Sequence, residues 1–331
     1  MSPQSGWIRS PKLAAAALMA VAAIWGSTFI VVQDAVSRMP VMDFLAVRFS
    51  VAALAMIALH PQCLRGMTRL GFFRSIVLGL ILGLAYITQT FGLQQTSAAV
   101  SGFITGMFVV FTPILSAVLL RRTISSRVWS AVALSTIGLA LLSLYGWSIG
   151  GGELLTLLCA LLFALHIVGL GAWSGHHNVY GLAVLQIAFV AIISLAVTLP
   201  DGLTMPPDTA AWAAVGLTAI FATAAAFLIQ TWAQSLISPS RTAVIITMEP
   251  VFAGLFAVLF AGEHLTIRIV LGAALVLTAM LLVELKQATS PPAYHAGALE
   301  VDGYLNKPDV TNVIFDLTGP IVSPDETLFK G

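Results

Sequence analysis

Three ionisable side chains stand out because they lie well inside long apolar stretches of this chain. Glu249 directly precedes Pro250, and Arg48 and His166 each follow several apolar residues of their own stretch. In the hydrocarbon region of a bilayer an ionisable group costs about 2.5–3.5 kcal/mol on insertion scales, so it needs a partner or a watery cavity. Glu249 is therefore the leading candidate for a carboxylate that faces a cavity and either exchanges a proton or binds a cationic group.

Each of these side chains also has a purely structural interpretation. Neighbouring hydroxyls or an arginine could satisfy Glu249. Arg48 could form a structural pair or extend to the outer interface, and we class it as structural or gating. His166 could line a cavity or titrate near neutral pH. Its counterpart in an earlier segment, Thr28, is also polar, which favours the cavity.

Polar side chains recur at a fixed spacing along the chain. One constant shift aligns Gln89-Thr90-Phe91 with Gln230-Thr231-Trp232, and a slightly smaller shift aligns Trp25 with Phe163. We call the first alignment the Gln89–Gln230 register and the second the Trp25–Phe163 register. Side-chain amides in lipid must hydrogen-bond to another helix or to a substrate, so the matched amides predict interhelical bonds or a shared site.

These residues define a candidate site. Trp25 is either an aromatic wall of that site or a lipid-facing side chain. The candidate residues for binding a substrate or a proton are Glu249, His166, Gln89, Gln230, Tyr86, Trp232, Thr28 and Trp25.

Two prolines fall near the centres of apolar segments. Pro113 and Pro250 lie about one helical turn apart in the Gln89–Gln230 register. A proline inside a helix removes one backbone hydrogen bond and bends the helix. We expect both residues to bend their helices, either as gating points or as passive kinks.

The composition excludes a soluble protein. Hydrophobic residues make up 59% of the chain and charged residues 9%, compared with roughly 25% charged residues in a soluble domain. The net charge of +1 gives no indication of nucleic-acid binding. Cys63 and Cys159 are far apart in sequence, so neither a disulfide nor a metal site is expected. The chain has no phosphate-binding loop and no metalloprotease motif, and we expect no enzymatic activity and no cofactor.

The pattern of apolar segments predicts the fold class. A transmembrane helix needs about 20 mostly apolar residues. Ten segments qualify: 12–35, 41–60, 71–93, 96–120, 127–146, 150–171, 179–200, 209–235, 239–261 and 265–286. A repeat with an odd number of spans inserts its second copy upside down, and inverted repeats around a midplane site are typical of secondary transporters. We predict an all-α integral membrane protein of ten transmembrane helices, arranged as two inverted five-helix repeats at 12–146 and 150–286.

Lysine and arginine residues predict the orientation of these spans. The side that holds both termini carries Arg9, Lys12, Arg65, Arg69, Arg74, Arg121, Arg122, Arg127, Arg241 and Lys286. The other side carries only Arg38 and Arg268. Because positive residues concentrate on the cytoplasmic side, both termini should be cytoplasmic. Residues 288–331 are acidic and proline-rich, and we predict a flexible cytoplasmic tail.

Several motifs resemble those of one family. They are Trp25-Gly-Ser-Thr-Phe-Ile, Arg48-Phe-Ser, the segment 96–113 and the segment 238–250 with its terminal Glu249-Pro250. Together they resemble ten-span members of the drug/metabolite transporter superfamily with two EamA-type repeats. The resemblance implies inner-membrane carriers, commonly exporters of amino acids or other small metabolites, with a central cavity between the halves. Arg121-Arg122 stands where the first repeat of that family often has an acidic residue, so no acid acts there.

The sequence therefore predicts a secondary transporter that exports small metabolites by alternating access. Its partners would be a small-molecule substrate, the lipid bilayer and protons, and we hypothesise proton coupling through Glu249. Two other functions stay open. The chain could be an uncoupled facilitator, or a membrane scaffold or sensor that acts through residues 288–331.

Overall fold

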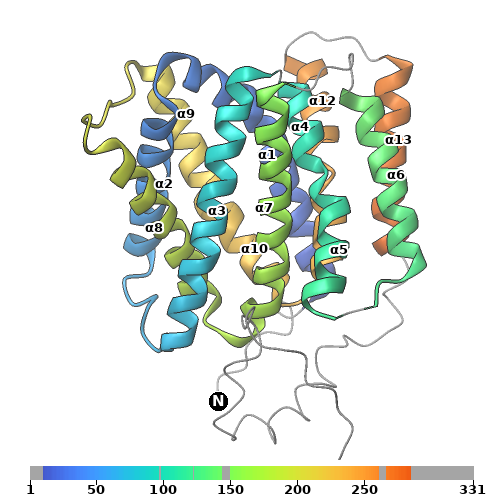
Figure 1. Ribbon diagram of the computed structural model, residues 1–331, viewed down its shortest axis with the longest axis horizontal. Helices are drawn as coiled ribbons and strands as arrows, with labels where there is room; N and C mark the ends of the chain where they lie inside the picture. Colours follow the sequence, from blue (N-terminus) through green and yellow to red (C-terminus); the bar gives the residue numbers. More distant parts are fainter. Residues whose placement is uncertain (1–9, 97, 122, 144–149, 261–265, 285–331) are drawn as a thin grey trace, which may run out of the picture. The chain divides into compact units, whose positions relative to one another are not determined.

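The computed structural model describes residues 10–96, 98–121, 123–143, 150–260 and 266–284, and within these ranges every regular element is helical (Figure 1). The predicted tail at 288–331 lies outside the described residues. The elements are α1 (Pro11–Arg38), α2 (Val41–Leu59), α3 (Arg69–Gln95), α4 (Ala98–Gly106), α5 (Phe108–Leu119), α6 (Ser126–Ser143), α7 (Gly151–Trp173), η2 (Ser174–His176), α8 (Val179–Thr198), α9 (Thr209–Ala219), η3 (Ile220–Ala225), α10 (Ala226–Gln234), α11 (Pro239–Ile246), α12 (Glu249–Phe260) and α13 (Ile267–Glu284).

Six helical segments in the described part of the chain are long and apolar enough to cross a membrane. Five are α1, α2, α3, α8 and α7 with its short extension η2. The sixth runs through α9, η3 and α10, where η3 is a π-helical turn inside an otherwise α-helical span. A π-helical turn widens a helix locally and occurs frequently at functional sites.

Two of the predicted spans are interrupted rather than continuous. A turn at Met107 separates α4 from α5, and a turn at Thr247 and Met248 separates α11 from α12. Pro250 consequently lies in the first turn of α12, where a missing N–H breaks no helical hydrogen bond, so the predicted mid-helix bend at this residue is wrong. Pro113 does lie inside its helix, as the sixth residue of α5.

The second half of the bundle repeats the helix bounds of the first. Helices α4, α5 and α6 begin at positions 98, 108 and 126, and α11, α12 and α13 begin at positions 239, 249 and 267. Each of these three pairs of starting positions has the same spacing as Gln89 and Gln230. The contacts repeat as well. Helix α5 packs on α11, and its counterpart α12 packs on α4, the counterpart of α11. Helix α3 packs on α7, and its counterpart α10 packs on α1, the counterpart of α7. Figure 1 shows α4 and α12 together toward one end of the bundle and α5 toward the other.

Close contacts define the directions of the helices. The Gln94 side-chain amide donates to the Val36 carbonyl, so α1 and α3 end on the same side of the bundle. Gly92, near the end of α3, lies against Gly152 in the first turn of α7. Helix α7 therefore starts at the side where α1 and α3 end, and it runs in the opposite direction to both.

Gly92 gives a test of this packing. A Cβ at Gly92 would lie 2.9 Å from the Gly152 carbonyl oxygen and would also collide with the Thr156 hydroxyl. We expect Gly92→Ala to lower the free energy of unfolding by about 1–3 kcal/mol, because backbone must move. Gly216 in α9 has no atom within 4 Å of its Cβ position, so Gly216→Ala should leave stability unchanged or raise it by up to about 1 kcal/mol. Unfolding of the purified variants in detergent measures both, and equal stabilities would contradict the packing.

Candidate functional site

A central cavity is lined by polar and aromatic side chains from several of the helices. Its empty volume is about 700 Å³, a figure that includes the open space at its mouth. The lining residues are Trp25, Thr28, Phe29, Val32, Arg48, Tyr86, Gln89, Thr90, Leu93, Thr105, Phe108, Phe163, His166, Ile167, Phe227, Gln230, Ile246 and Glu249. Thr105 and Phe108 flank the first helix break, and Ile246 and Glu249 flank the second, so both breaks reach the cavity wall.

Glu249 is the first residue of α12 and lines the cavity with only 8% of its surface exposed. Within the described part of the chain its carboxylate forms neither an ion pair nor a hydrogen bond with another side chain. The N-terminus of a helix carries partial positive charge, which favours an anion. The break therefore provides some stabilisation for a carboxylate that has no other partner among the described residues.

Arg48 is buried, with 4% of its surface exposed, and lines the same cavity. Its Nε donates to the Thr223 hydroxyl at 2.9 Å, and its guanidinium carbon lies 5.0 Å from the centroid of the Tyr86 ring. A guanidinium at this distance from an aromatic face is attracted by the ring. Arg48 thus does not extend to the outer interface, which was one of the two structural interpretations of this residue.

The π-helical turn η3 supplies partners for two other helices. Thr223 lies in η3 and accepts from Arg48, and the Ala222 carbonyl accepts from Trp25 Nε1 at 2.8 Å. Trp25 also lines the cavity and contacts the ring of Phe227 at 5.6 Å. Trp25 is therefore an aromatic wall of the cavity and not a lipid-facing side chain.

His166 belongs to a chain of hydrogen bonds. Its Nε2 lies 2.7 Å from Gln186 Oε1, and Gln186 Nε2 donates to the Thr231 hydroxyl at 3.2 Å. Thr231 in turn donates to the Phe227 carbonyl at 2.6 Å. The amide oxygen of Gln186 needs a donor, so the Nε2 of His166 carries a proton in this arrangement. His166 lines the cavity, yet its ring is held by neutral partners.

Most of the predicted binding residues meet at the cavity. Thr28, Tyr86, Gln89 and Gln230 all line it. Trp232 does not: it lies two positions beyond Gln230, about 200° further around the helix, and packs instead on an apolar cluster with α11.

Sequence reasoning missed several lining residues. Among them are the aromatic rings of Phe163 and Phe227 and the side chains beside the helix breaks. Phe163 is the counterpart of Trp25, and Phe227 is the counterpart of Tyr86 in the Gln89–Gln230 register. That correspondence is the signal that could have identified both rings.

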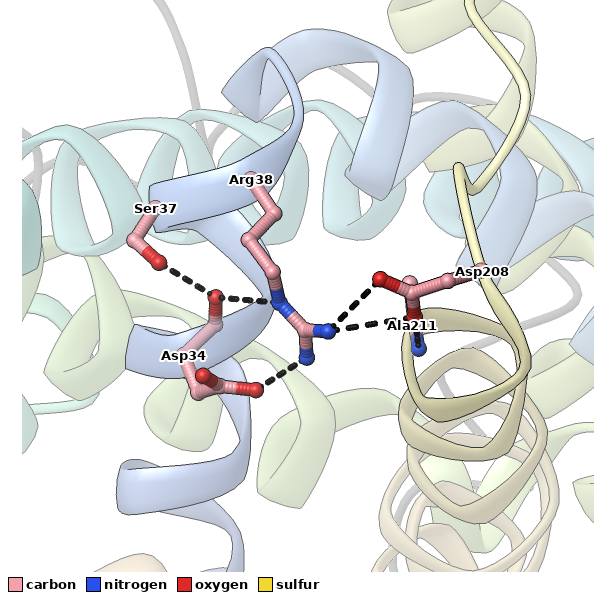
Figure 2. Close-up of polar contacts among 5 residues, drawn as sticks. All are labelled: Asp34, Ser37, Arg38, Asp208 and Ala211. Carbon is pink, nitrogen blue, oxygen red and sulfur yellow. Dashed lines mark hydrogen bonds and ion pairs between the residues drawn. The ribbon is translucent and has the colours of Figure 1, made fainter.

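The end of α1 is tied to the beginning of α9 by an exposed cluster (Figure 2). Arg38 forms ion pairs with Asp34 and with Asp208, the latter with an Nη1–Oδ2 distance of 2.9 Å. Asp208 also caps α9, because its Oδ1 accepts from the Ala211 N–H at 2.8 Å. The Ala211 N–H and then the Arg38 guanidinium lower the pKa of Asp208 below its ordinary value.

An apolar helical bundle with interrupted helices beside a central cavity is found in many membrane transporters. Comparison with known families agrees. The model of the EamA-like transporter family matches residues 12–144 and again residues 150–285. The chain therefore belongs to the EamA-like transporter family. It is a multi-pass membrane transporter of small molecules and not an enzyme.

Two relatives support this assignment at different levels. An uncharacterized transporter of Archaeoglobus fulgidus is 36% identical over 270 residues, which cover 81% of this chain and 85% of that protein. A solved crystal structure of a protein matches with a TM-score of 0.70 and 16% identity, and covers 83% of this chain and 99% of that one. At this identity the second match shows a shared fold alone.

Asp208 allows the cap and the ion pair to be separated. We expect Asp208→Ala to lower Tm in detergent, and Asp208→Ser to lower Tm much less. Serine can still cap the helix, and an exposed ion pair contributes little. Because the pKa of Asp208 is lowered on folding, its contribution is complete above the ordinary aspartate pKa and is lost as the pH falls through the lowered value. The Tm difference between wild type and Asp208→Ala should therefore shrink at low pH. Equal Tm values for the two variants would contradict the dominance of the cap.

Proposed function

We propose that this chain is a ten-helix secondary transporter built from two inverted five-helix repeats, residues 12–146 and 150–286, that works by alternating access. It would export small metabolites across the inner membrane, with both termini in the cytoplasm and with proton coupling through Glu249. The observation that carries this proposal is the pairwise correspondence of the cavity-lining residues of the two halves.

Seven pairs of lining residues correspond between the halves. The pairs in the Trp25–Phe163 register come from α1 and α7. The pairs in the Gln89–Gln230 register come from α3 and α10 and from the two interrupted spans. Together the pairs are Trp25 and Phe163, Thr28 and His166, Phe29 and Ile167, Tyr86 and Phe227, Gln89 and Gln230, Thr105 and Ile246, and Phe108 and Glu249. Such a lining is expected when a site lies at the interface of two inverted repeats.

Four lining residues lack a lining counterpart, and all four belong to the first half: Val32, Arg48, Thr90 and Leu93. Their counterparts in the second half, Leu170, Gln186, Thr231 and Gln234, are buried and do not line the cavity. Val32 and Leu93 lie toward the side where α1 and α3 end. The cavity therefore extends toward that side, which the distribution of Lys and Arg predicts to be the outside. We interpret this arrangement as the outward-facing state.

Tight contacts close the opposite side. A Cβ at Gly171 would lie 3.0 Å from Pro239 Cδ, so the end of α7 is packed directly on the beginning of α11. The Gln234 side-chain amide donates to the Ile167 carbonyl at 2.7 Å, which ties α10 to α7. An inward-facing state would require these contacts to separate and the corresponding contacts of the first half to form.

Glu249 has two competing influences on its protonation. The cavity wall shields its carboxylate from water, which favours the neutral acid, while the N-terminus of α12 favours the anion. Both protonation states are therefore accessible in one site, as proton coupling requires. The charged and titratable side chains around the same cavity are Arg48, Tyr86 and His166.

Replacement of Glu249 tests the coupling. A metabolite panel that compares efflux from overexpressing and deletion cells would first identify a transported compound. In proteoliposomes we expect a proton gradient to accelerate wild-type transport of that compound. Glu249→Gln should reduce the rate about tenfold or more and abolish its dependence on the gradient, since an amide cannot release a proton.

Glu153 provides a matched control. It is an acidic residue in the first turn of α7, and its carboxylate accepts from the Gly150 N–H outside the cavity. Glu153→Gln should leave the gradient dependence unchanged. Wild-type rate and pH dependence in Glu249→Gln would refute proton coupling and leave an uncoupled facilitator.

A further inference from the structure

The cavity contains one buried guanidinium group and one buried carboxyl group that do not pair with each other. Arg48 and Glu249 line the same cavity from α2 and α12. The ion pairs found among the described residues join Arg38 to Asp34 and Asp208, and neither cavity residue takes part in them. Charges buried in a membrane protein are normally paired or face a cavity that contains their partner.

The contacts of Arg48 fix its position without supplying a negative charge. Thr223 accepts from its Nε, and the rings of Tyr86 and Phe49 lie 5.0 and 5.4 Å from its guanidinium carbon. All three are neutral groups. A guanidinium carries its five donors in a planar fork, which matches a carboxylate through two parallel hydrogen bonds. Arg48 is thus held rigidly, at the cavity wall, in a form suited to an anionic partner.

The corresponding position in the second half shows that the fold does not require a charge here. Gln186 is the counterpart of Arg48 and is buried between His166 and Thr231, with which it forms hydrogen bonds at 2.7 and 3.2 Å. This neutral network is complete without an ion. The arginine of the first half therefore serves something other than the packing of the span that contains it.

We propose that Arg48 binds the carboxylate of the substrate, with Glu249 binding the cationic group of the same molecule in the same cavity. The rest of the lining contributes apolar surface, which includes the rings of Trp25, Phe163 and Phe227. The substrate class is accordingly a small zwitterion with an apolar body. This inference rests on the proposed function, because it assigns a ligand to the transport cavity.

Three probes that share one aromatic body separate the two charged groups: L-phenylalanine, 3-phenylpropionate and phenethylamine. Binding to the purified full-length protein in lipid nanodiscs is measured by calorimetry. Wild type should bind both carboxylates. Arg48→Gln, which installs the residue of the corresponding position, should weaken both about tenfold or more and leave phenethylamine unchanged, because only the carboxylates lose a charge-assisted hydrogen bond.

Two further variants keep the test decisive. Thr223→Val removes the partner of Arg48 Nε but keeps the charge, and it should weaken carboxylate binding selectively even if Arg48→Gln fails to fold. Arg74→Gln is the control, because Arg74 lies outside the cavity beside Trp173 and His177. It should leave all three affinities unchanged.

Two results would overturn the proposal. One is wild-type affinity for 3-phenylpropionate in folded Arg48→Gln or Thr223→Val, and the other is failure of wild type to bind either carboxylate. Flux of a bound probe into proteoliposomes is measured separately. Selective carboxylate binding without any flux would support the role of Arg48 and contradict the proposed transport of these compounds through the cavity.

Discussion

The structure depends on one constraint: a charge buried in a bilayer must be stabilised by something other than bulk water. Each of the two charged residues of the cavity lies next to irregular backbone. Glu249 begins a helix because α11 ends at a turn, and Arg48 contacts Thr223 of the π-helical turn η3. Irregular backbone within the membrane is tolerated where it lines a cavity. The helix break and the π-helical turn therefore occur where regular helices would offer the charges fewer partners.

The apolar helical segments and the family could be predicted from the sequence. Both depend on the length of apolar runs and on the spacing of a few polar motifs, which are properties of the linear sequence. Matched residues such as Gln89 and Gln230 line one cavity, while their role in binding stays a prediction. The breaks at Met107 and at Thr247 and Met248 were not predicted, because an apolar run has the same composition whether or not its backbone turns. Trp232 was assigned to the site from its neighbours in sequence, although the helical period directs it away.

The two halves agree in backbone and differ in charge. The bounds of α4, α5 and α6 recur in α11, α12 and α13, whereas Arg48 corresponds to Gln186 and Glu249 to Phe108. A solved structure with 16% identity shares the fold, so the fold tolerates very different side chains. In the proposed mechanism, matched backbone would provide two equivalent arrangements of the bundle, and unmatched side chains would provide a single set of charges for the substrate. We infer that the repeat determines the motion and that the differences between its copies determine what is bound.

The central claim is that the two halves exchange arrangements, and one pair of residues tests it directly. Thr90 and Thr231 are corresponding residues whose hydroxyls donate to the carbonyls of Tyr86 and Phe227, but only Thr90 lines the cavity. In a background without Cys63 and Cys159, single cysteines at 90 and 231 are treated with a membrane-impermeant thiol reagent from either side during transport. The account predicts that Thr90→Cys reacts only from outside and Thr231→Cys only from the cytoplasm. A transport-competent Thr231→Cys that never reacts from the cytoplasm would contradict it.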